Sequence, residues 1–306
     1  MNTPGSPAPA MNWRGVLPAI TTPFTSSLEV DHDFLATHTR QLANAGCIGI
    51  VPLGSLGEGA TLHYDEKIAI LKTCIASVGE QVPVVPGIAS LSTAEACQLA
   101  RDAADLGCQG LMVLPPYVYS TDWREMRAHV AAVIETTNLS CMLYNNPPAY
   151  QTDFLPEHIA TLAAAHSNLH AVKESSGDIR RVTEIRRRCG DRLDILVGID
   201  DIIVEGVAAG AVGWIAGLVN AFPRESVRLF ELARDAKWQE AQELYEWFLP
   251  LLRFDTGPRF VQKIKLAQER LQIGNARVRP PRLPLAGAEL AEVEQTLAAA
   301  LERRAL

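Results

Sequence analysis

One lysine of this 306-residue chain stands at the end of a short apolar run and before small polar residues, in the segment HAVKESSGD over residues 170–178. An apolar run that stops at a turn predicts a buried strand, with Lys173 at its carboxyl end. Burial lowers the pKa of an amine, and a neutral amine can attack a carbonyl carbon to form a Schiff base. Taken alone, Lys173 is more typical of a solvated side chain or a partner of Glu174.

Two further polar segments follow other predicted strands. The segment GSLGEG over residues 54–59 and the segment YNNP over residues 144–147 supply a hydroxyl at Ser55 and a phenol at Tyr144. Each segment alone is typical of an ordinary turn, and we expect Glu58 to be structural. Glycines allow a ligand to approach the backbone closely, so the amides of this first turn could bind a carboxylate.

The chain alternates short apolar segments with amphipathic ones eight times, which predicts a parallel sheet with helical crossovers. The predicted strands are 16–21, 48–53, 82–87, 110–114, 140–144, 169–173, 193–197 and 211–216. The predicted helices between and after them are 31–45, 65–78, 93–106, 123–136, 156–165, 179–189, 202–209 and 223–236. Eight units favour an α/β fold closed into a (β/α)8 TIM barrel, in which the carboxyl ends of the strands converge on one mouth.

The domain organisation follows from where this alternation starts and stops. We predict a disordered tail over 1–12, the barrel over 13–236, and a C-terminal helical region over 237–306. The first strand is not followed by GxGxxG, which weakens a dinucleotide-binding alternative. In the barrel, Lys173, Tyr144 and Ser55 would share one face.

Composition excludes several classes of function. The formal net charge of -7 argues against a nucleic-acid or anionic-membrane partner, and no apolar run approaches the length of a membrane span. The tail has no basic start and no apolar centre, so it does not read as a secretory signal. The six cysteines lack CxxC spacing, so we expect reduced thiols in a cytoplasmic protein and no metal site.

Three of these segments together resemble the dihydrodipicolinate synthase/N-acetylneuraminate lyase family of class I aldolases, over nearly the whole chain from Gly15 to about Leu285. The matching motifs are GSLGE at 54–58, YNNP at 144–147 and KESSG at 173–177. The resemblance implies a Schiff-base lysine and a proton-transferring tyrosine, together with a substrate-binding set and a homotetrameric assembly. The implied catalytic residues are Lys173, Tyr144 and Ser55, and the implied substrate-binding residues are Gly54, Leu56, Gly57, Asn146, Gly198 and Ile215.

The sequence also departs from the synthase of this family. Ala149 stands where the synthase has an arginine for the second substrate's carboxylate, and Leu56 replaces a hydroxyl residue of the turn. The tyrosine that the synthase borrows from a neighbouring subunit matches Val118, beside Tyr117 and Tyr119. An apolar side chain cannot hydrogen-bond a carboxylate, so these departures argue against the synthase.

A closer similarity is to the Δ1-pyrroline-4-hydroxy-2-carboxylate deaminases of hydroxyproline breakdown. It is carried by YNNPPAY at 144–150, VQKIKL at 261–266 and RPPRLP at 279–284. We therefore predict a deaminase that dehydrates a cyclic imino acid and releases ammonia and 2,5-dioxopentanoate. The alternatives are 4-hydroxy-tetrahydrodipicolinate synthase, a 2-keto-3-deoxy sugar-acid aldolase or dehydratase, and a non-catalytic small-molecule sensor.

The predicted chemistry needs neither metal nor organic cofactor, because a protonated Schiff base on Lys173 is itself an electron sink. The substrate is a small keto or imino acid whose carboxylate lies on the backbone amides of Ser55 and Leu56. Tyr144, relayed through Ser55, moves the protons.

Overall fold

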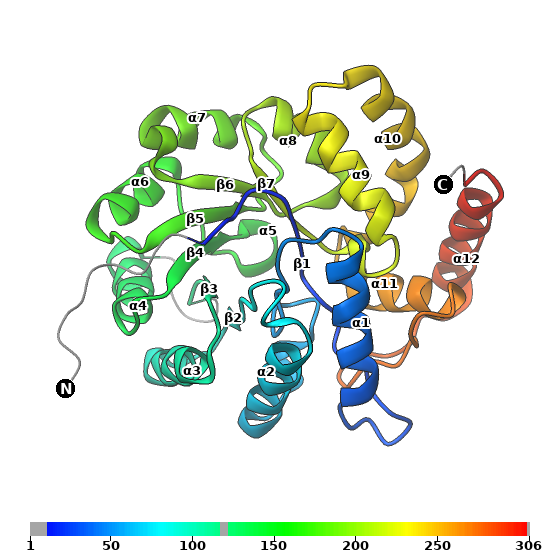
Figure 1. Cartoon of the computed structure of the whole chain (residues 1–306), viewed down its shortest axis with the longest axis horizontal. Coiled ribbons are helices and arrows are strands. Elements are labelled where there is room, and N and C mark those ends of the chain that lie inside the picture. Colours follow the sequence, from blue (N-terminus) through cyan, green and yellow to red (C-terminus); the bar gives the residue numbers. More distant parts are fainter. Residues whose placement is uncertain (1–10, 117–121, 305–306) are drawn as a thin grey trace.

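The computed structural model describes residues 11–116 and 122–304, and its centre is a parallel sheet. Seven strands pair in the order β1-β7-β6-β5-β4-β3-β2, and neighbouring strands in this order are parallel. The strands are β1 (Val16–Pro18), β2 (Gly87–Ile88), β3 (Gly110–Val113), β4 (Ser140–Asn145), β5 (Leu169–Glu174), β6 (Asp194–Val197) and β7 (Gly213–Ala216). Figure 1 shows these strands at the centre of a ring of helices.

Residues 48–53, predicted as a strand, take the remaining place between β1 and the residues before β2. The backbone N–H of Val51 donates to the Pro18 carbonyl oxygen at 2.9 Å, and that of Ile50 donates to the Pro83 carbonyl oxygen at 2.9 Å. Parallel bridges join this segment to both sides. The segment therefore closes the barrel, and the predicted (β/α)8 class is confirmed.

Helices cover the outside of the barrel, and most begin and end within two residues of the prediction. They are α1 (His32–Asn44), α2 (Tyr64–Val78), α3 (Thr93–Leu106), α4 (Trp123–Glu135), α5 (Pro147–Tyr150), α6 (Pro156–Ala165), α7 (Arg180–Cys189), α8 (Ile203–Ala208), α9 (Pro223–Arg234), α10 (Trp238–Leu252), α11 (Phe260–Arg270) and α12 (Gly287–Glu302). Asp31 caps α1 by accepting a hydrogen bond from the N–H of Phe34. The short α5 was predicted only as a turn.

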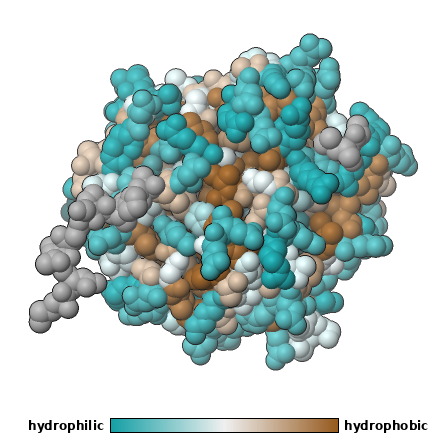
Figure 2. Space-filling model, in the orientation of Figure 1, coloured by the Kyte–Doolittle hydropathy of each residue, from teal (hydrophilic) through white to brown (hydrophobic). Residues whose placement is uncertain are grey.

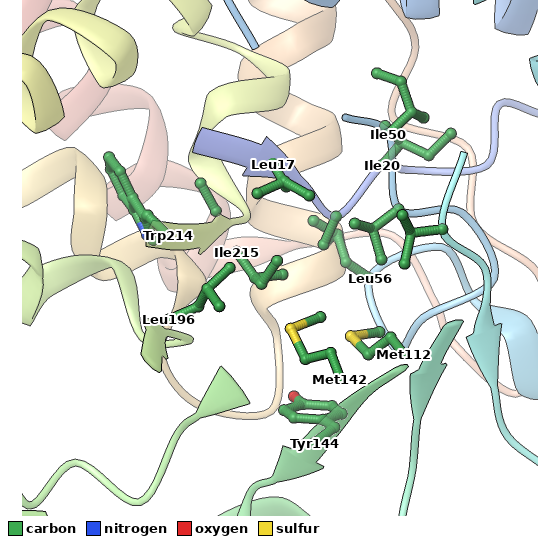
Figure 3. Packing of buried hydrophobic residues seen from close by; sticks show 14 of the residues in the cluster. Leu17, Ile20, Ile50, Leu56, Met112, Met142, Tyr144, Leu196, Trp214 and Ile215 are labelled. Atoms are coloured by element: carbon green, nitrogen blue, oxygen red, sulfur yellow. The ribbon is translucent and has the colours of Figure 1, made fainter. Parts of the chain in front are cut away.

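The interior of the barrel is filled by apolar side chains from different strands. Figure 3 shows Leu17, Met142 and Leu196 among them, with Leu56 and Ile215 on the side of the cavity described below. Strands buried on both faces carry near-continuous apolar sequences, which is why these segments stand out in the sequence. Figure 2 shows hydrophilic residues over much of the rim of the molecule.

The C-terminal helices pack on one side of the barrel, where α10 contacts α9 and α12 contacts α10 (Figure 1). A short turn, η5 (Arg253–Asp255), joins α10 to α11. Residues 1–10 of the predicted tail lie outside the described residues, and Met11 packs against the core. The six cysteines are free thiols, and no described helix is long and apolar enough to span a membrane.

Candidate active site

A cavity of about 640 Å³ lies at the carboxyl ends of the strands and brings most of the predicted residues together. The strand ends and the turns after them form much of its wall, and η5 and the residues after it contribute the rest. The predicted residues that line it are Gly54, Ser55, Leu56, Tyr144, Asn146, Lys173, Gly198 and Ile215. Figure 3 shows Leu56, Tyr144 and Ile215, which come from three different parts of the barrel, with Met112 and Met142 between them.

Lys173 is buried at the end of β5, with 6% of its surface exposed. Its Nζ lies over the ring of Tyr144, 4.0 Å from the centroid. In the described part of the chain no group accepts a hydrogen bond from this amine. Burial lowers the pKa of Lys173 to about 8, although the charges of Asp255 and Asp200 act to raise it.

Glu174 is not the partner of this lysine. Its carboxylate accepts hydrogen bonds from the N–H of Ser176 at 2.7 Å and from Nδ2 of Asn145 at 3.1 Å. The carboxylate is therefore held by its own turn and by β4. Lys173 is therefore neither a solvated side chain nor a partner of Glu174. It is a buried amine that faces a cavity.

The phenol of Tyr144 stands at the end of β4, next to this amine. Its oxygen accepts a hydrogen bond from Nδ2 of Asn146 at 2.8 Å. Burial raises the pKa of Tyr144 to about 12, so the phenol is protonated at neutral pH. A protonated phenol beside a Schiff-base nitrogen can donate or return a proton.

The hydroxyl of Ser55 pairs with the hydroxyl of Tyr150, on α5. It also lies close enough to Tyr144 to act against the rise in the pKa of that phenol. The proton relay from Tyr144 through Ser55 stays a prediction, and that prediction did not include Tyr150. The two tyrosine rings meet edge to face with centroids 5.8 Å apart. The sequence could have indicated Tyr150 as a site residue, since it ends the YNNPPAY motif.

Gly57 is the one predicted substrate-binding residue that does not line the cavity. Its carbonyl oxygen accepts a hydrogen bond from the Thr22 hydroxyl at 2.6 Å, and a Cβ on Gly57 would lie 3.0 Å from the Ile20 carbonyl oxygen. This part of the turn therefore packs against the chain after β1. Glu58, expected to be structural, is buried and pairs with Lys265 at 2.7 Å.

Sequence reasoning missed further lining residues, among them Ser175, Asp255 and Arg282. Ser175, two residues after Lys173, is fully buried, and its hydroxyl lies close enough to Tyr144 to act against the rise in the pKa of that phenol. Asp255 and Arg282 reach the cavity from the C-terminal region. None of the motifs contains Asp255, and the RPPRLP motif contains Arg282 without indicating that it reaches the cavity. Only the packing of the C-terminal region against the barrel brings both residues there.

Two buried aspartates near the amine, Asp200 and Asp255, differ in their hydrogen bonds and in how far their pKa values are raised. Asp200, behind the cavity wall, accepts hydrogen bonds from Trp214 Nε1 at 2.9 Å and from the N–H of Leu218 at 2.7 Å. Burial nevertheless raises the pKa of Asp200 to about 6. The pKa of Asp255 is raised well above its usual value by burial and by Asp200. A buried lysine beside a phenol at the mouth of a (β/α)8 barrel defines a class I, Schiff-base-forming lyase.

Comparison with known proteins agrees with this class. The model of the dihydrodipicolinate synthetase family matches residues 12–300. A 4-hydroxy-tetrahydrodipicolinate synthase of Agrobacterium fabrum is 34% identical over 88% of this chain and 92% of its own length. The chain therefore belongs to the dihydrodipicolinate synthetase family, whose members are Schiff-base lyases.

Solved structures extend the comparison to the fold. The 4-hydroxy-tetrahydrodipicolinate synthase of Methylacidiphilum fumariolicum SolV has a TM-score of 0.90 at 28% identity, covering 95% of this chain and 96% of that one. A prophage protein of Escherichia coli K12, solved in complex with pyruvate, has a TM-score of 0.89 at 26% identity, covering 94% and 99%. The likeness thus spans the barrel and the C-terminal helices.

Proposed function

We propose that the chain joins Lys173 to C2 of a small 2-oxo or cyclic 2-imino acid. The observation that carries this proposal is a buried amine with a pKa of about 8, facing a cavity of about 640 Å³. Such an amine is substantially neutral near pH 8 and therefore nucleophilic. The resulting protonated Schiff base withdraws electrons from the neighbouring carbon, so the proposed reaction proceeds without metal or organic cofactor.

The proposed orientation of the substrate follows from the cavity wall. The carboxylate lies at the turn of Gly54, Ser55 and Leu56, where backbone amides can donate to it. Tyr144 then faces the imine from the other side and moves protons, with the hydroxyls of Ser55 and Tyr150 next to it. Ile215 and Gly198 complete the wall.

For the overall reaction, the first candidate is that of 4-hydroxy-tetrahydrodipicolinate synthase, which condenses pyruvate with aspartate semialdehyde. Its support is that the reported relative from Agrobacterium fabrum carries this name over 88% of the chain. A second carboxylate in the cavity would need a cation, and Arg282 lines the wall. We propose Arg282 for that contact under this candidate.

The second candidate is the Δ1-pyrroline-4-hydroxy-2-carboxylate deaminase reaction. Two observations favour it: Leu56 and Ala149 both line the cavity, and neither side chain can hydrogen-bond a second carboxylate. A cyclic imino acid has only one carboxylate, so it needs no hydrogen-bond donor at these two positions. In that reaction the imine opens onto Lys173, water leaves from C4, and hydrolysis releases ammonia.

The test begins with trapping. The chain is incubated with pyruvate or with the imino acid and reduced with cyanoborohydride, and the adduct is located by mass spectrometry. We expect the added mass on Lys173, and the variant Lys173→Ala should gain none. Trapping in that variant, or the absence of any adduct in the unaltered chain, would refute the proposal.

The second stage separates the candidates. Consumption of pyruvate that depends on aspartate semialdehyde supports the synthase, and ammonia release from the imino acid supports the deaminase. The variant Arg282→Gln provides a structural control: it should raise KM for aspartate semialdehyde and leave the trapping of pyruvate unchanged. Cleavage or dehydration of 2-keto-3-deoxy sugar acids would instead indicate the remaining alternative.

We also propose that the protein works in the cytoplasm as a homotetramer. Six free thiols are consistent with a reducing compartment. Tyr117 and Tyr119, either of which could complete a neighbouring subunit's cavity, lie outside the described residues.

A further inference from the structure

A carboxyl group lies in the same cavity as Lys173, although it comes from the far end of the chain. Asp255 ends the η5 turn, and it is the only acidic residue among the described residues that line the cavity. It lies against Gly217, just after β7, where a built Cβ would overlap its carboxylate. The absence of a side chain at position 217 thus leaves room for the Asp255 carboxyl group.

Asp255 differs from Asp200, its acidic neighbour. Asp200 accepts hydrogen bonds from the indole of Trp214 and from the N–H groups of Gly217 and Leu218. Within the described ranges, no group donates a hydrogen bond to Asp255. Donors stabilise an ionised carboxylate, and two neighbouring carboxylates disfavour a double charge. The negative charge therefore stays on Asp200, and Asp255 is the member that holds a proton.

Lys173 is the cation that acts on this carboxyl group. The charge of Lys173 lowers the pKa of Asp255, whereas burial, Asp200 and Asp201 raise it. In turn, the charges of Asp255 and, to a smaller extent, Asp200 raise the pKa of Lys173. With the proton on Asp255, the Lys173 amine is free to attack. The cavity thus contains a nucleophile and a proton donor that share one proton.

We propose that Asp255 is the acid–base residue of Schiff-base formation at Lys173. The amine's electron pair forms a bond to C2 of the 2-oxo acid, and a nitrogen-bound proton passes to the former carbonyl oxygen, giving a carbinolamine. Asp255 then donates its proton to that hydroxyl, the C2–O bond breaks, and water leaves as the nitrogen pair forms C=N. Hydrolysis returns the proton to Asp255.

This inference rests on the Schiff-base step of the proposed function, and it does not depend on which overall reaction follows. It predicts that fast imine formation requires the proton on Asp255. A side chain of the same shape without that proton should not support the same rate. Asparagine has the same shape and cannot supply that proton, so Asp255→Asn is the informative change. Asp235, an exposed carboxylate after α9, offers a matched control.

The experiment mixes each chain with pyruvate, quenches with cyanoborohydride at set times, and follows the adduct on Lys173 by mass spectrometry over a range of pH. We expect Asp255→Asn to slow imine formation by about 10²–10⁴-fold and to remove the fall in rate at high pH, while the rise due to Lys173 remains. Asp255→Glu should keep part of the rate, and added formate should accelerate Asp255→Ala. Asp235→Asn should match the unaltered chain.

The outcomes separate this inference from the function on which it rests. If the unaltered chain gains no adduct on Lys173, both are overturned. If it gains one and Asp255→Asn gains it at the same rate, the role of Asp255 alone is overturned. If Asp255→Asn does not fold, Asp255→Ala decides: acceleration by formate supports the acid–base role, and no acceleration in a chain with unaltered circular dichroism overturns it.

Discussion

At the scale of single residues, the site depends on how burial and charge compete at Lys173. Removing an ammonium group from water favours the neutral amine, and the nearby carboxylates favour the cation. Burial is the larger effect here, since the pKa of Lys173 falls from 10.5 to about 8. The amine is buried beside the Tyr144 ring, with Nζ 4.0 Å from the ring centroid.

The first prediction concerns the pH dependence of this residue. The neutral form attacks, so the rate of imine formation with pyruvate should rise about tenfold per pH unit below pH 8. Above that pH the amine is already neutral, so the rise should stop, and the rate should fall once Asp255 loses its proton. Timed cyanoborohydride trapping between pH 6 and pH 10 measures it, with Lys173→Ala as the blank. A plateau that begins only near pH 10.5 would mean that Lys173 is solvated.

At the scale of elements, a glycine after one strand makes room for a polar side chain of the neighbouring strand. Gly198 follows β6 and lies against the side chain of Lys173. A built Cβ at this position would overlap Oγ of Ser175 and would lie 2.6 Å from Cε of Lys173, which is closer than real atoms approach. The small residue on one strand therefore makes room for the long side chain on the next.

The second prediction follows from that contact. Gly198→Ala should displace the amine, reduce imine formation at least tenfold, and cost about 1–3 kcal/mol of the free energy of unfolding through overpacking. Urea denaturation and timed trapping measure the two effects. Gly107→Ala is the control, because it strains a left-handed residue at the end of α3 with open space around it. That variant should lose stability and keep its rate of imine formation.

A buried ion pair connects the turn after residues 48–53 to α11. Nζ of Lys265 lies 2.7 Å from Oε1 of Glu58, and both side chains are almost entirely buried. Nζ also donates to the carbonyl oxygen of Arg277, and Glu58 accepts the N–H of Arg279. This pair ties the C-terminal region to the turn that forms one wall of the cavity.

The third prediction is a double-mutant cycle on this pair. Glu58→Gln or Lys265→Met alone leaves a buried group without its partner and should cost about 3–5 kcal/mol of the free energy of unfolding. The double variant should cost clearly less than the sum of the two, because no buried charge of the pair remains. Urea denaturation measures all four chains. Additive losses would show that the two groups do not act together.

At the scale of the whole molecule, the C-terminal helices do more than cover one side of the barrel (Figure 1). The turn after α10 brings Asp255 into the cavity, and the segment before α12 brings Arg282. The cavity is thus assembled from both regions of the chain. A barrel truncated after α9 would lack the residues that we assign to acid–base chemistry and to the second carboxylate.

The fourth prediction concerns assembly. If the chain is a homotetramer, sedimentation velocity should give a mass about four times the 33.3 kDa of one chain. Diluting the protein until this mass falls should also reduce activity if a neighbouring subunit completes the cavity. Tyr119→Phe and Tyr117→Phe, compared at a concentration that keeps the assembly intact, would then show which phenol contributes. Full activity in a monomer would contradict the prediction.

The sequence alone determined the barrel and the positions of the two residues that we propose for catalysis. Buried parallel strands must be apolar along their length, and a lysine or tyrosine at the end of such a run stands out, so Lys173 and Tyr144 could be identified from local pattern. The family motifs placed Ser55 and Gly198 in the same cavity, and the structure agrees. Gly57 belongs to the same turn and does not line the cavity, because a motif does not say which of its residues face inward.

Only the tertiary structure decided what surrounds that pair. Asp255 lies 82 positions beyond Lys173 in the numbering, and no local pattern marks it as facing the amine. The pairing of Ser55 with Tyr150 required the helical geometry of α5, where the sequence indicated a turn. The local sequence pattern indicates which residues are buried and where strands end. The charges that decide which group holds a proton come from residues far apart in the sequence, which meet only in the folded chain.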